Sequence, residues 1–132
     1  MAGRVFFFLQ HASFEPAFQA TSMGLTAAAM GDEVYFVFAF EALRQLVRGE
    51  LGAPITPHER DECARAQALN VPTPAQMLQE ARGLGARLVA CDTTVRLCGL
   101  VPHELAAGGV LDEVMGLAAL WRLTAGARML TV

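Results

Sequence analysis

Short apolar runs recur along the chain and predict the strands of a buried sheet. The first run, Arg4–Gln10, is almost continuously apolar and contains three phenylalanines. A run of this kind is typical of a strand that is covered on both faces. The other predicted strands are Glu33–Phe38, Arg87–Cys91, the weaker run Val110–Met115, and Arg128–Val132.

Segments with helical spacing separate these runs. Phe14, Phe18, Leu25 and Ala29 recur on one helical face after Ser13, which is a favourable N-cap residue. A threonine followed by proline, with Glu or Gln three residues after the threonine, predicts the start of two later helices. The predicted helices run from Ser13 to Gly31, from Leu43 to Gly49, from His58 to Leu69, from Thr73 to Arg82, from Asp92 to Gly99 and from Leu117 to Ala125, and residues 101–109 are expected to form a loop.

Strands that alternate with helices predict a three-layer α/β/α fold with a mostly parallel, five-stranded sheet. The whole chain, residues 1–132, has the length of a single domain. Residues 49–72 are interpreted as an inserted loop and helix within it. We expect the charged helix His58–Leu69 to lie over the carboxyl edge of the sheet and limit access to Cys91. The alternative is a solvated surface helix remote from that site.

The composition narrows the classes of function. Apolar residues make up 54% of the chain and charged residues 17%, which fits a sheet covered on both faces or a subunit that buries a further patch in an oligomer. We expect a homo-oligomer. A net charge of −3 provides no electrostatic footprint for nucleic acid. No apolar stretch has the length of a membrane span or the form of a signal peptide, and the three cysteines form no disulfide framework. We therefore expect a cytoplasmic protein.

Chemistry is expected at the carboxyl ends of the strands, where open α/β sheets bind their ligands. Cys91 ends a predicted strand and directly precedes a helix, whose N-terminal N–H groups favour a thiolate. His11 follows the first strand and would activate this sulfur if it faced the same crevice. The predicted catalytic residue is Cys91, and the predicted binding residues are His11, Ser13, Asp92, Thr93 and Thr94.

More ordinary roles remain open for these residues. Cys91 can be a buried strand-end residue without chemistry, and His11 can bond to its own loop. Cys98 lies two helical turns beyond Cys91, too far for a disulfide, and is expected to pack in the core, whereas Cys63 is expected to be incidental. The cysteines and histidines lack metal-ligand spacing and no glycine-rich phosphate motif follows a strand, so neither a metal nor a cofactor is predicted.

Three blocks of the chain occur together in a recognisable order. They are Ala28–Phe36 with Phe40–Leu43, Gly85–Cys91 continuing through Cys98–Leu100, and Gly116–Trp121. In this order they resemble the DsrE/DsrF-like (DsrEFH-like) family, and the resemblance covers most of the chain outside residues 49–72. It implies a small, oligomeric α/β protein of sulfur relay. The cysteine that matches Cys91 would carry a persulfide between donor and acceptor proteins, and Cys91 is the only residue to which the resemblance assigns a catalytic role.

Three functions compete at this point. The first is a persulfide carrier or sulfurtransferase that uses Cys91. The second is a non-catalytic, oligomeric binding module of the same fold, in which Cys91 is structural. The third is a thiol peroxidase or redox sensor, which is disfavoured because no resolving cysteine is well placed.

Overall fold

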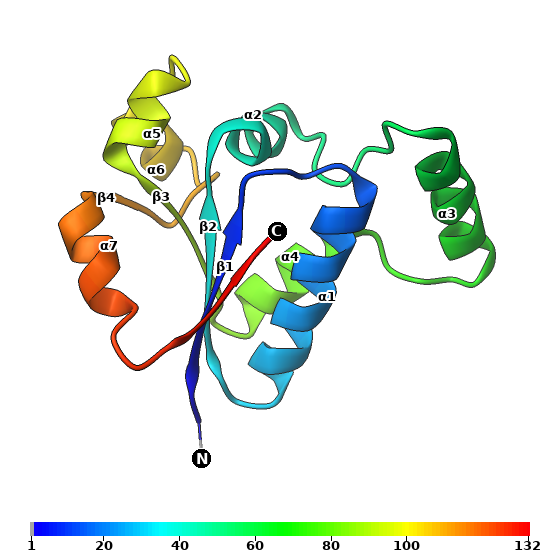
Figure 1. Cartoon of the computed structure of the whole chain (residues 1–132), viewed down its shortest axis with the longest axis horizontal. Helices are drawn as coiled ribbons and strands as arrows, with labels where there is room; N and C mark the ends of the chain where they lie inside the picture. Colours follow the sequence, from blue (N-terminus) through cyan, green and yellow to red (C-terminus); the bar gives the residue numbers. More distant parts are fainter. Residues whose placement is uncertain (1) are drawn as a thin grey trace.

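The computed structural model describes residues 2–132 and has one five-stranded sheet (Figure 1). The strand order is β4-β3-β2-β1-β5, and every neighbouring pair is parallel. The strands are β1 (Arg4–Leu9), β2 (Glu33–Phe38), β3 (Arg87–Cys91), β4 (Glu113–Met115) and β5 (Arg128–Thr131). The predicted α/β fold class is confirmed.

Helices cover the sheet on both faces. They are α1 (Phe14–Ala29), α2 (Phe40–Arg48), α3 (Pro57–Ala68), α4 (Pro74–Gly83), α5 (Asp92–Leu97), α6 (Pro102–Ala107) and α7 (Leu117–Leu123). On one face α1 packs against α4, and on the other face α7 packs against the sheet through Leu120 (Figure 1). The two faces are unequal, because α1 has 16 residues and α7 only seven.

Alternation along the central strands divides the core into two clusters. Phe7 and Phe36 belong to the larger cluster, under α1 and α4, and their rings stack 5.5 Å apart. Phe6 and Tyr35 belong to the smaller cluster, under α7, with ring centroids 4.6 Å apart. Gly24 is what brings α1 so close to the sheet, since a Cβ atom there would overlap the Phe36 ring. The strand runs are apolar on both faces because both faces are covered.

The predictions for residues 101–115 are wrong in two respects, and α2 begins at Phe40, ahead of the expected Leu43. Residues 101–109 are not simply a loop, because Pro102–Ala107 forms α6 with Pro102 in its first turn and Leu105 buried. β4 covers only Glu113–Met115. The chain ahead of it turns at the two glycines 108–109, and Leu111 packs into the core instead of pairing in the sheet. A buried leucine outside a strand satisfies the same hydrophobic pattern as a strand residue.

The predicted lid over Cys91 is also wrong. α3 and α5 lie at opposite ends of the longest axis of the molecule, with α2 between them (Figure 1). α3 instead lies beside the start of α1, to which it is tied by the buried side chain of Glu59. The proline-flanked segment therefore covers the N-terminal end of α1 and leaves the end of β3 uncovered.

Candidate functional site

Three chain segments meet at the carboxyl edge of the sheet, as the parallel order requires. The register pairs Leu9 with Phe38 and Val37 with Val89, so β1, β2 and β3 end at nearly the same level. The segments that follow them are residues 10–13, 39–41 and 91–94. This edge therefore contains most of the predicted site residues, although not all of them touch.

Cys91 is the last residue of β3 and the N-cap of α5. Its backbone is extended, with φ −75° and ψ 133°, and its side chain is partly exposed and in no disulfide. The first turn of α5 follows directly and contains Asp92, Thr93 and Thr94, of which Thr93 is exposed. Asp92 does not cap this helix, because its carboxylate accepts a hydrogen bond from Arg96 Nε at 2.9 Å. Cys91 is thus a partly exposed residue at the junction of a strand and a helix.

His11 does not pair with Cys91. Its Nδ1 lies 3.3 Å from Glu41 Oε2, and 66% of its side chain is exposed. Among residues 2–132 no hydrogen bond joins His11 to Cys91, and β2 lies between their strands. Two strand spacings amount to about 10 Å, which exceeds direct proton transfer. The histidine that would activate the sulfur is therefore engaged by a carboxylate in the first turn of α2.

Ser13 faces α3 and not Cys91. It is buried and occupies the N-cap position of α1, but its side chain caps no backbone N–H of that helix. The Glu59 carboxylate takes this role, accepting from the N–H of Glu15 at 2.7 Å, and it also accepts from the Ser13 hydroxyl. Burial raises the pKa of Glu59, but these hydrogen bonds and one from Ile55 N–H outweigh it and hold the pKa below 4.5. A carboxylate from α3 thus fills the anion-favouring end of α1.

Phe40, Glu41 and Arg44 belong to this edge and were not predicted as site residues. Phe40 has a φ of 49° and is 44% exposed. A bulky residue in the left-handed region is a backbone outlier, and such strain gathers at functional sites. Arg44 Nη1 donates to Cys98 Sγ at 3.9 Å, and Cys98 packs against the main core as expected. Position after β2 was the available signal for all three, because residues that follow parallel strands share one edge.

Cys63 occupies a different environment beneath α3. It lines a cavity of about 390 Å³ together with Phe14, Leu51 and Val71. Burial, and then the nearby carboxylates of Glu59 and Glu62, raise the pKa of the Cys63 thiol. These surroundings favour the neutral thiol of Cys63.

Neither a metal centre nor a membrane span is found among residues 2–132. No three of the potential ligands His, Cys, Asp and Glu in that range gather around one point where an ion could be held. None of the helices there is at once long enough and apolar enough to cross a bilayer.

The chain was also compared with known proteins. No family model matches it, and no curated protein matches it.

Proposed function

We propose that this chain carries sulfur as a persulfide on Cys91. The observation that supports the proposal is the partly exposed cysteine at the carboxyl end of β3, at the N-cap of α5, with α3 at the far end of the molecule (Figure 1). Ligands of open α/β sheets bind at this edge. The resemblance to DsrE/DsrF-like proteins agrees with the proposal and stays a prediction.

The transfer step needs only a donor persulfide. The Cys91 thiolate attacks the outer sulfur of a donor R–S–SH, and a new S–S bond forms as the S–S bond of the donor breaks. The products are Cys91–S–SH and the thiolate R–S⁻, so no external oxidant or reductant is required. Release is the same exchange in the opposite direction, with an acceptor thiolate attacking the outer sulfur.

The surroundings of Cys91 are suited to exchange with a partner. The thiol is exposed enough to be reached, and among residues 2–132 no second cysteine lies in hydrogen-bond or disulfide contact with it. A persulfide there is consequently not consumed by an internal disulfide. The sulfur donor and acceptor proteins, and a cytoplasmic location, belong to this proposal.

Intact mass after incubation with glutathione persulfide tests the proposal. The wild-type chain is expected to gain about 32 Da, and Cys91→Ser is expected to gain nothing. Cys63→Ser is the matched control and should load as the wild type does. Loading of Cys91→Ser at the wild-type level would contradict the proposal. A wild-type chain that gains no mass with glutathione persulfide, but gains about 16 Da as a sulfenic acid in a separate incubation with peroxide, would also contradict it.

A further inference from the structure

The outer edge of β5 is open. β5 pairs with β1 on one side, and no strand of residues 2–132 pairs with its other side. Val132 donates its N–H to Phe8 O and accepts from Gln10 N, so it faces β1. Because backbone direction alternates along a strand, the N–H and C=O groups of Met129 and Thr131 face outward.

β5 is a short edge strand of four residues, and several of the usual protections of an edge are missing from it. Proteins commonly blunt such edges with lysine, proline, a bulge or a covering segment. Residues 128–132 contain neither lysine nor proline, and the register with β1 is continuous from Arg128 to Thr131. The one charge on the strand, Arg128, is already paired with Asp32 at 3.0 Å. The edge is therefore free to accept another strand.

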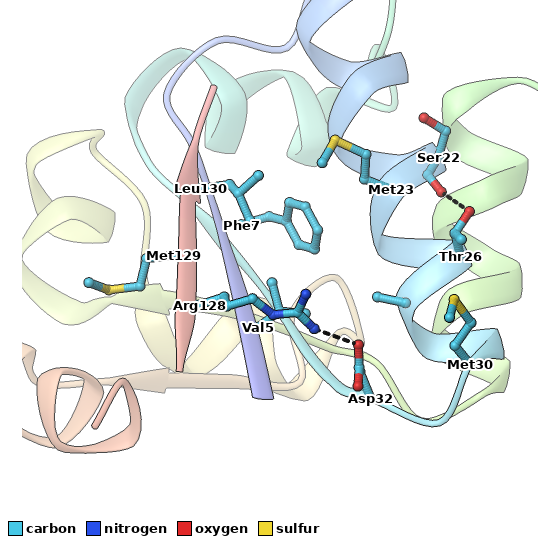
Figure 2. A pocket seen from close by; sticks show the side chains of 11 residues that line it. Val5, Phe7, Ser22, Met23, Thr26, Met30, Asp32, Arg128, Met129 and Leu130 are labelled. Carbon is cyan, nitrogen blue, oxygen red and sulfur yellow. Dashed lines mark hydrogen bonds and ion pairs between the residues drawn. The ribbon is translucent and has the colours of Figure 1, made fainter. Parts of the chain in front are cut away.

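An apolar groove of about 710 Å³ lies beside this edge, between β5 and α1 (Figure 2). Phe7 and Leu130 lie on the sheet side of the groove, and Met23 and Met30 on the helix side. Met30 is 79% exposed, although methionine usually packs in a core or an interface. An open edge and an exposed apolar groove thus occupy the same margin of the molecule.

We propose that a second copy of this chain pairs with β5 in antiparallel orientation, about a two-fold axis at Leu130. In this register Met129 lies opposite Thr131 of the partner subunit, and each pair exchanges two backbone hydrogen bonds. Leu130 lies opposite its own counterpart, with both side chains on the groove side of the sheet. The N–H of Ala127 already donates to Thr124 O and is not available to a partner strand. The proposed register therefore uses the outward backbone groups of Met129 and Thr131.

Charge placement favours the antiparallel over the parallel orientation of a second copy. The two-fold axis puts the Arg128 side chains of the two copies at opposite ends of the strand pair, about 14 Å apart along it. That separation exceeds the Debye length of about 8–10 Å in physiological salt, so the like charges are screened. Parallel pairing in register would place them side by side. The closed interface uses one surface patch twice, as in most symmetric dimers.

The dimer is independent of the sulfur chemistry. β3 and Cys91 lie toward the other side of the sheet, beyond β1 and β2, so both thiols stay accessible in the joined sheet. An oligomer is expected from the apolar composition, and the edge of β5 would be its interface.

Light scattering tests the interface with edge variants. Met129→Pro removes an outward N–H that one copy alone does not use, and Thr131→Lys adds an edge charge. The wild type is expected at twice 14.1 kDa and both variants near 14.1 kDa, with unchanged circular dichroism. Leu69→Lys, at an exposed leucine after α3, is the control and should remain dimeric. A wild type that is monomeric at about 100 μM, well above a micromolar Kd, would overturn the proposal, as would variants that dimerise like the wild type.

Cysteine cross-linking tests the register. In a background with Cys63, Cys91 and Cys98 replaced by serine, Leu130→Cys should form a disulfide dimer on mild oxidation, because directly opposed Cα atoms lie about 4.5 Å apart. Met129→Cys is the matched control, since its counterpart lies diagonally at about 7–8 Å. Efficient cross-linking through Met129→Cys and none through Leu130→Cys would overturn this pairing.

Discussion

Cys63 and Cys91 are both partly exposed, but their surroundings differ in charge and access. Cys63 lines a cavity beneath α3, where burial and the carboxylates of Glu59 and Glu62 raise the pKa of its thiol. Cys91 lies at the carboxyl edge of the sheet, where the carboxylate of the next residue, Asp92, forms an ion pair with Arg96. Two cysteines of similar exposure thus differ in the charges beside them, and those of Glu59 and Glu62 disfavour the thiolate of Cys63.

The same two regions also differ in backbone strain. Each contains a non-glycine residue with positive φ, Asn70 after α3 and Phe40 at the start of α2. Asparagine tolerates the left-handed region, whereas a bulky phenylalanine does not. Among the non-glycine residues of 2–132 with positive φ, the bulky one is therefore at the edge that contains Cys91.

Among the variants that distinguish the surroundings of Cys63 from those of Cys91, replacement of Glu59 should have the largest effect. Glu59→Gln leaves an amide N–H₂ group facing backbone donors, and we expect the free energy of unfolding to fall by about 1.5–3 kcal/mol. Urea denaturation measures this change. Alkylation of Cys63 should become faster, because a nearby negative charge is gone and α3 is held less firmly, while alkylation of Cys91 stays as it was. Glu50→Gln, at an exposed loop carboxylate, is the control.

The effect of Glu59→Gln should depend on pH. The pKa of Glu59 is lower in the folded chain than the ordinary value of 4.5, so its stabilisation is complete above that value. It is lost as the pH falls through the folded pKa. The stability difference between wild type and Glu59→Gln should therefore narrow below pH 4.5, and a difference that widens there would contradict the assigned role.

The order of thiol labelling should show the next largest effect. Each unit by which the pKa of Cys63 is raised lowers its thiolate fraction about tenfold at neutral pH. Brief alkylation should therefore label Cys91 before Cys63. Trypsin separates the two, because residues 61–65 and 88–96 form different peptides between arginines. Preferential labelling of residues 61–65 would reverse the comparison.

Substitution of Phe40 should show the strain directly. Phe40→Gly and Phe40→Ala both remove the aromatic ring, so their difference reports only the backbone. Glycine adopts positive φ freely, and we expect Phe40→Gly to be more stable than Phe40→Ala by about 1–2 kcal/mol in thermal denaturation. Equal stabilities would mean that the backbone at this edge is not strained.

Removing His11 should have the smallest effect. Its contact with Glu41 is an exposed pair, worth about 0–1 kcal/mol. Because β2 separates His11 from Cys91, the imidazole is too far away to take the proton of the thiol directly. His11→Ala should therefore change the alkylation rate of Cys91 by less than about twofold. A much larger loss of rate would show that His11 activates the sulfur after all.

Strands and local helix starts could be predicted from the sequence. Glu33–Phe38 and Arg87–Cys91 have the predicted bounds, because a doubly covered strand is a continuous apolar run. The start of α4 also follows the prediction, since Thr73 and Gln76 form a capping box within four residues. Both signals are local, so the sequence contains them.

Contacts between distant residues could not be predicted in the same way. Glu59 has the sequence of a capping-box residue, yet its carboxylate bonds to Glu15, which is 44 residues away. That contact joins α3 to the start of α1, away from the expected position over Cys91. The positive φ of Phe40 also depends on how β2 meets α2, and no residue preference of phenylalanine indicates it.

Peptide mapping of the loaded protein tests the central claim most directly. Each cysteine lies in its own tryptic peptide, residues 61–65, 88–96 and 97–122. After incubation with glutathione persulfide, residues 88–96 should gain about 32 Da and lose it again when an excess of a small thiol accepts the sulfur. A stable gain on residues 61–65 or 97–122, with residues 88–96 unmodified, would contradict the assignment of Cys91 as the sulfur carrier.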